Sequence, residues 1–300
     1  MHERSIFSLI TMKKLKNHIY KQGVTSLMLF LLLSGCSFPL SSSVDDILKG
    51  MSRVPDSKIV QDALPTYIIM IESMLAKTPD DPTLLQAAAQ LYRFYGIQLV
   101  EQPERALLIT DTALEYAMKA AATTIPVFEN GRMIDYPLFE EVIQNATVAD
   151  LEPLYIIGEV WLEWIRVRKD DMDAIADLPI IQLIMERVVA LEPGYRKGMA
   201  SMYLAVLAAM EMAERETINR HFSRAIEAAG EQNIMPSVFF ALWLKNDGKH
   251  AQSCATLSDV INKGVPDDPA FSLFNEYAMK EAVRIKKELV EDESCKVGGN

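Results

Sequence analysis

The residue with the clearest chemistry is Cys36, which closes the segment Leu33-Ser34-Gly35-Cys36. A thiolate is the strongest nucleophile among the side chains, and small residues before it give a peptidase access. The segment follows four lysines between Lys13 and Lys21 and an apolar run from Val24 to Leu33. That run is too short to cross a hydrocarbon core, which needs about 20 helical residues. The pattern predicts a lipobox; the alternative is a single-pass anchor with an incidental cysteine.

Cleavage at the lipobox makes residues 1–35 a lipoprotein signal peptide and Cys36 the first mature residue, carrying palmitate or other acyl chains. Ser37 follows where inner-membrane retention would favour aspartate, so we expect a lipid anchor on the periplasmic face of the outer membrane. Residues 36–56 begin with Ser-Phe-Pro-Leu-Ser-Ser-Ser after the cysteine, which predicts a flexible tether.

The sequence offers little support for catalytic, phosphate-binding or metal-binding sites. Only His221 and His250 remain after cleavage, which excludes a three-histidine zinc site, and no phosphate-binding glycine loop or nucleophile elbow occurs. Asp170, Asp171 and Asp173 cluster without the glycine and glutamate of a calcium loop, so we predict helix capping there. We expect no enzyme, no cofactor and no metal site.

Cys254 and Cys295 remain after lipidation of Cys36. In an oxidising compartment they could form a disulfide that ties the C-terminal tail to a helix. Two free thiols, one of them buried, are equally compatible with the sequence.

The charge of the mature chain is strongly negative. Residues 1–35 hold five of the 30 basic and one of the 41 acidic residues, which leaves 25 and 40 and a net charge of −15. An acidic body repels phosphate backbones and anionic lipids, so nucleic-acid binding is disfavoured and acylation is left as the membrane attachment.

Helical periodicity dominates residues 57–290. Leu64, Ile68, Ile71 and Leu75 recur on one helical face, and no stretch alternates with a period of two. Further helices are expected over 84–100 and from Pro103 to about residue 122, with a loop and a short helix in 123–150. Acid-proline pairs separate helices at Asp81-Pro82, Glu152-Pro153, Glu192-Pro193 and Asp268-Pro269. We predict an all-α, tetratricopeptide-like solenoid of degenerate repeats, followed by a polar tail at 291–300.

A series of segments resembles the T-component lipoproteins of tripartite ATP-independent periplasmic (TRAP) transporters. The series consists of Leu154-Tyr155, Trp161-Leu162-Glu163-Trp164-Ile165, residues 170–179, Leu191-Glu192-Pro193-Gly194-Tyr195, Met202-Tyr203-Leu204, residues 221–225 and Asn275-Glu276-Tyr277-Ala278. The resemblance implies a helical lipoprotein that binds the periplasmic solute-binding (P) component, assembles as a homotrimer and holds an apolar ligand within its body. The acidic C-terminal end departs from the aromatic, leucine-rich helix typical of the family.

Large flexible side chains in the middle of the chain are candidates for a ligand cavity. The candidates are Tyr155, Trp161, Trp164, Met199 and Met202, since methionines adapt to irregular apolar ligands. The alternative is that they are ordinary core residues between stacked helices. Arg166 and Arg168 could pair with a carboxylate ligand or with Asp170 and Asp173 at the surface, and the surface pairing is favoured.

Two functions therefore follow from the sequence. One is a non-enzymatic accessory of a TRAP transporter that binds a solute receptor and an apolar or amphipathic ligand. The other is a structural scaffold lipoprotein of an envelope complex, with a solid core and no ligand.

Overall fold

The first described helix shows how the pattern produces the fold. The structure, a computed structural model, describes Gly50, Val54 and residues 57–268, 271–292 and 295. Helix α3 (Ser57–Leu75) buries Val60, Leu64, Ile68, Ile71 and Leu75 along one face, as their spacing predicts. This face packs on α4 (Pro82–Gln98), and the two helices share a hydrophobic cluster.

The described residues contain helices and no strand, which confirms the predicted all-α class. They belong to one compact unit, residues 44–300. After α4 come α5 (Pro103–Ala122), α6 (Tyr136–Asn145), α7 (Leu151–Arg166), α8 (Met172–Ile175), α9 (Leu178–Leu191), α10 (Met199–Met210), α11 (Arg215–Ala229), α12 (Met235–Asn246), α13 (His250–Lys263) and α14 (Ser272–Glu291).

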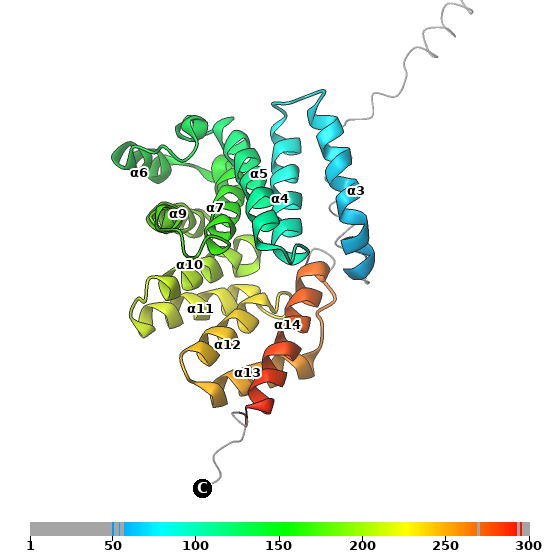
Figure 1. The fold of residues 1–300 in the computed structure, drawn as a ribbon. Coiled ribbons are helices and arrows are strands. Elements are labelled where there is room, and N and C mark those ends of the chain that lie inside the picture. Colours follow the sequence, from blue (N-terminus) through cyan, green and yellow to red (C-terminus); the bar gives the residue numbers. More distant parts are fainter. Residues whose placement is uncertain (1–49, 51–53, 55–56, 269–270, 293–294, 296–300) are drawn as a thin grey trace, which may run out of the picture. The chain divides into compact units, whose positions relative to one another are not determined.

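Each long helix packs on the next one along the chain, as in a helical solenoid (Figure 1). The pairs run α3–α4, α4–α5, α5–α7, α7–α9, α9–α10, α10–α11, α11–α12, α12–α13 and α13–α14. Contacts also join helices two apart, such as α10 with α12 and α12 with α14, and α14 touches α3. A large second cluster of buried apolar side chains extends from α4 to α14.

Capping by acidic residues explains the starts of two helices, α4 and α8. Asp81 accepts hydrogen bonds from the backbone N–H groups of Thr83 and Leu84, and Pro82 begins α4. Asp171 accepts from Asp173 and caps the short helix α8, which is the capping role expected for that aspartate. Residues 123–150 contain two 3-10 turns and α6, as predicted for a loop with a short helix.

A tight backbone contact joins α10 to α11. The 3-10 turn before α10, Tyr195–Gly198, holds Arg196, Lys197 and Gly198 at positive φ angles of 49°, 52° and 79°. A Cβ at Gly198 would lie 2.3 Å from the carbonyl oxygen of Ala225 on α11. Glycine therefore serves two purposes here, a left-handed conformation and an approach that no side chain permits.

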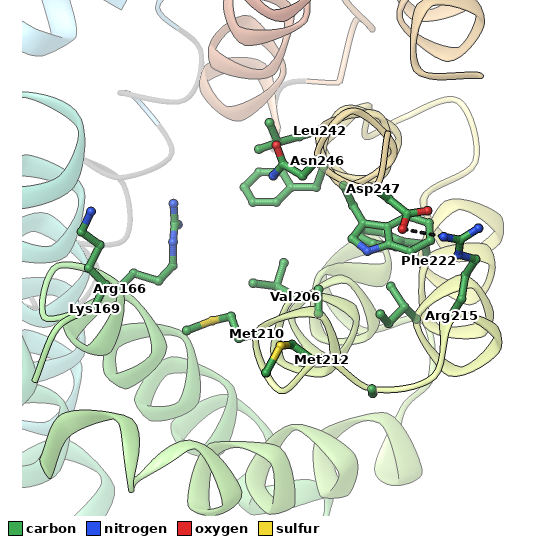
Figure 2. Close-up of a pocket in the computed structure, with 15 residues that line it drawn as sticks. Arg166, Lys169, Val206, Met210, Met212, Arg215, Phe222, Leu242, Asn246 and Asp247 are labelled. Carbon is green, nitrogen blue, oxygen red and sulfur yellow. Dashed lines mark hydrogen bonds and ion pairs between the residues drawn. The ribbon is translucent and has the colours of Figure 1, made fainter. Parts of the chain in front are cut away.

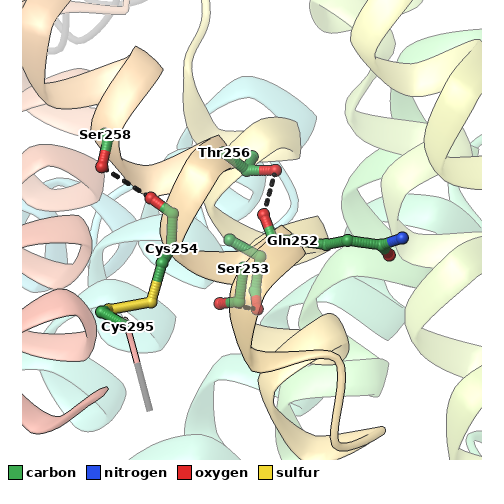
Figure 3. Close-up of a disulfide and its surroundings, with 7 residues drawn as sticks. Gln252, Ser253, Cys254, Thr256, Ser258 and Cys295 are labelled. Atoms are coloured by element: carbon green, nitrogen blue, oxygen red, sulfur yellow. Dashed lines mark hydrogen bonds between the residues drawn. A yellow bond between two sulfur atoms is a disulfide. The ribbon is translucent and has the colours of Figure 1, made fainter. Parts of the chain in front are cut away.

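A disulfide ties the C-terminal tail to α13. Cys254, on α13, is bonded to Cys295, beyond the end of α14 (Figure 3). Cys254 is buried on α13, together with Ser253, Leu257 and Val260.

The predicted signal peptide, Cys36 and most of the predicted tether and polar tail lie outside the described residues. Among the helices that are described, none combines the length and the apolar character needed to span a membrane.

Candidate functional site

An apolar groove lies between the end of α7 and helices α10, α11 and α12. It has a volume of about 750 Å³, which is within the range of small-molecule sites. Its apolar lining comes from Val206, Ala209, Met210, Met212, Ala213, Ile218, Phe222, Phe239, Leu242 and Trp243 (Figure 2). We call it the α10–α12 groove.

Aromatic side chains form one wall of the groove. The ring of Phe222 lies 5.3 Å from that of Phe240 and 6.0 Å from that of Trp243, and Phe240 stacks on Trp243 at 5.9 Å. These contacts fix the rings, since offset aromatic pairs add stability beyond their buried area. A rigid aromatic wall therefore faces flexible methionines, an arrangement suited to apolar ligands of variable shape.

Charged side chains lie on two sides of the groove, and the amide of Asn246 lies between them. Arg215 pairs with Asp247 at 2.7 Å on one side, and Arg166 and Lys169 lie on the other (Figure 2). Three cations and one carboxylate thus border an apolar surface.

A smaller cavity lies beyond the groove and shares Arg166 and Phe239 with it. We call it the inner cavity. Its volume is about 60 Å³, space for roughly two waters or one small polar group. Its remaining lining comes from Arg93, Phe94, Ile97, Glu163, Met199, Met202, Tyr203, Met235, Phe274 and Tyr277.

A buried ion pair supports the inner cavity. The guanidinium of Arg93 lies 3.1 Å from Glu159 Oε1, and both side chains are more than nine-tenths buried. The hydroxyl of Tyr203 donates to the same carboxylate at 2.7 Å, and that of Tyr155 donates at 3.4 Å. These donors compensate a carboxylate that would otherwise be costly to bury.

Burial and charge set the protonation of this network. Burial, followed by the charge of Glu159, raises the pKa values of Tyr155 and Tyr203 well above their ordinary values. Burial alone would lower the pKa of Arg93, but the attraction of Glu159, helped by Tyr203, raises it overall. Both hydroxyls therefore keep their protons, and Arg93 keeps its charge.

A second ion pair lies where the inner cavity meets the groove. Arg166 Nη1 lies 2.7 Å from Glu163 Oε2, and Glu163 is buried while Arg166 is partly exposed. The charge of Glu163 is the main cause of a raised pKa of Arg166. Around the inner cavity, the positive charges of Arg93 and Arg166 are thus balanced by the negative charges of Glu159 and Glu163.

Trp164 lies at a third cavity, formed by α4, α5 and the turn at Pro126–Asn130, with a volume of about 590 Å³. Its indole N–H donates to Asp111 at 2.7 Å, and the guanidinium groups of Arg132 and Arg168 each lie 4.2 Å from its ring centroid. Trp161 is fully buried and donates to Asp177 at 3.0 Å.

The five predicted cavity residues do not converge on one site. Met199 and Met202 line the inner cavity, whereas Trp164 lines the third cavity. Tyr155 and Trp161 line none of these three cavities, and both are buried with their polar atoms bonded to carboxylates.

The prediction that Arg166 and Arg168 pair with Asp170 and Asp173 at the surface was wrong. Arg166 pairs with Glu163, three residues earlier on α7, and not with Asp170 or Asp173. Arg168 pairs with Asp111 on α5 at 2.6 Å. The physical reason is that the chain turns after α7, so Arg168 points back along the helix toward α5.

Sequence reasoning missed Arg93, Glu159 and Glu163. The two glutamates lie four residues apart within a helix that is otherwise almost wholly apolar, which is a signal for a buried charge. Arg93 between two aromatic residues gave a weaker signal. The contacts of Glu159 on α7 with Arg93 on α4 and Tyr203 on α10 depend on how these helices pack, which the sequence does not show.

No group of three or more histidine, cysteine, aspartate or glutamate residues within the described parts of the chain is placed to hold a metal ion.

A comparison with known families supplies independent information. The family model described as the TRAP transporter T-component matches residues 54–291, which span α3 to α14. A search of curated proteins finds no match.

Proposed function

Because the chain belongs to the TRAP transporter T-component family, we propose that it is a non-enzymatic periplasmic lipoprotein that binds the solute-binding component of its transporter. It would also hold an apolar or amphipathic ligand in the α10–α12 groove. The mechanism is binding and transfer, with no bond made or broken. The family match carries the role in TRAP transport, and the groove of about 750 Å³ supports the ligand.

The chemistry of the groove favours an apolar chain over a compact hydrophilic solute. Its floor and walls are aliphatic, methionine and aromatic side chains, and its charges lie along the two sides. An apolar chain would be removed from water along the groove, and each buried methylene contributes about 0.8 kcal/mol. A small polyanion would find only the bordering cations.

Attachment through Cys36 and location at the outer membrane complete the proposal. Metabolic labelling with a palmitate analogue would give a labelled protein in the outer-membrane fraction. The Cys36→Ala variant would lose the label. Labelling that persists in this variant, or a protein confined to the inner membrane, would contradict this part of the proposal.

Affinity purification of the native lipoprotein from envelope extract tests the function directly. Mass spectrometry of the purified material should identify a periplasmic solute-binding protein and a co-purified small molecule. Size measurement of the complex by light scattering would show whether three copies assemble, as proposed from the family. Recovery of envelope assembly proteins without any solute-binding protein would refute the transport role and favour a scaffold.

A further inference from the structure

The inner cavity contains a buried donor that the protein itself does not satisfy. Arg93 pairs with Glu159 through one terminal nitrogen, but its Nε has no hydrogen-bond partner among the described residues. Arg93 is 7% exposed and lines the cavity. A buried N–H without an acceptor is costly, so its position beside a cavity indicates an acceptor that comes from outside the chain.

The cavity and the groove are adjacent. Arg166 and Phe239 line both, so one elongated molecule could occupy the two spaces. Their sizes differ greatly, about 60 Å³ against about 750 Å³. The small space suits one polar group, and the large one suits an apolar chain.

Charge balance selects the kind of polar group. The positive charges of Arg93 and Arg166 are already balanced by Glu159 and Glu163. An added carboxylate would therefore be an uncompensated charge in a buried space, whereas an uncharged oxygen could accept from Arg93 Nε without that cost.

We propose that the inner cavity is the head-group subsite for an amphipathic ligand with an uncharged oxygen, a hydroxyl or a carbonyl, and a single apolar chain. Arg93 Nε–H donates to that oxygen, and the chain lies in the α10–α12 groove. The inference rests on the proposed ligand-binding function and specifies the class of ligand.

Decanol, decanoate and decylamine test the proposal, since they share one chain length and differ in the head group. The chain from Ser37 onward keeps the whole helical unit and needs no detergent. Trp243 lines the groove, so its fluorescence reports occupancy. We expect decanol to bind at least about tenfold more tightly than the two charged probes, since burying an unpaired charge costs several kcal/mol.

Arg93→Lys keeps a positive charge near Glu159 and removes the Nε–H. It should weaken decanol binding about tenfold or more, the usual effect of losing a hydrogen bond from a charged donor. Arg284→Lys, the same change at an exposed arginine of α14 that lines neither space, should leave decanol affinity nearly unchanged. Met202→Phe fills the cavity without altering the ion pair and should also weaken decanol binding.

Equal affinities for decanol and decanoate would overturn the head-group assignment, and so would Arg93→Lys binding decanol like the parent protein. If Arg93→Lys does not fold, Met202→Phe decides by the same criterion. Absence of binding by every probe also overturns the inference. The proposed partnership with the solute-binding protein is judged separately by affinity purification, so the two can fail independently.

Discussion

Gly198 offers the sharpest test of how α10 is positioned, because its environment is fixed by backbone atoms. In Gly198→Ala the new Cβ would lie 2.3 Å from the carbonyl oxygen of Ala225 and 3.1 Å from its carbonyl carbon. Relief requires α10 to move away from α11, because a helix backbone cannot rotate aside as a side chain can. Met199 and Met202 would move with α10, and both line the inner cavity.

Two effects add to the cost of this substitution. Alanine at φ +79° costs about 1–2 kcal/mol, the usual penalty of a left-handed residue with a side chain. The steric conflict adds about 1–3 kcal/mol, the range for overpacking. We therefore expect Gly198→Ala to lower the free energy of unfolding by about 2–5 kcal/mol.

Gly248 provides a matched control. Its φ is +74°, close to that of Gly198, but a Cβ there would meet nothing within 4 Å. Gly248→Ala should therefore show only the conformational cost of about 1–2 kcal/mol. Gly194→Ala, with φ −92° and open space, should change stability by less than about 1 kcal/mol.

Urea unfolding followed by far-ultraviolet circular dichroism measures all three variants, since the signal is helical. The midpoint should fall most for Gly198→Ala and least for Gly194→Ala. Equal midpoints for Gly198→Ala and Gly248→Ala would refute the close approach of α10 to α11 and the placement of the inner cavity that depends on it.

Three further predictions concern the disulfide, a histidine and the buried ion pair. Reduction, or replacement of Cys254 and Cys295 by alanine, should lower the free energy of unfolding by up to about 4 kcal/mol, as loop entropy predicts for a separation of 41 residues; a urea midpoint unchanged by reductant would contradict this. Burial, then the two arginines beside it on α11, lowers the pKa of His221 from its ordinary 6.5. The unfolded chain then binds the proton more readily, so stability should fall as pH decreases from 6.5 through the lowered pKa. Thermal unfolding of His221→Gln across this range should lack that fall and run parallel to the parent protein above it. Glu159→Gln leaves the buried charge of Arg93 uncompensated and should cost about 3–5 kcal/mol in chemical unfolding; a loss below about 1 kcal/mol would show that the pair is hydrated.

The helices themselves could be predicted because their signals are local. The inward face of α3 follows from the spacing of apolar residues within one short segment of the chain. Asp81-Pro82 likewise combines a capping oxygen with a fixed φ angle at the start of α4. The match to a known family likewise depends on the order of short segments along the chain. The break at residues 123–150 was visible because its helical pattern is interrupted.

The site was harder to predict because its members come from distant parts of the chain. Trp161 and Trp164 were both candidates for a single cavity, yet their indole groups bond to Asp177 and Asp111. Their spacing places them one turn apart but says nothing about the neighbouring helices. Arg93, the proposed head-group donor, was distinguished from a surface arginine only by its aromatic neighbours Tyr92 and Phe94.

The sequence by itself therefore determined the all-α class, the approximate helix boundaries and the expectation of a lipid anchor, since each depends on residues close together in the chain. Only the tertiary structure decided which side chains line the groove and the inner cavity. The groove arises where α7, α10, α11 and α12 meet, and the inner cavity where α4, α7, α10, α12 and α14 meet. Charge compensation between Arg93 and Glu159, 66 positions apart, depends on that packing and not on any local pattern.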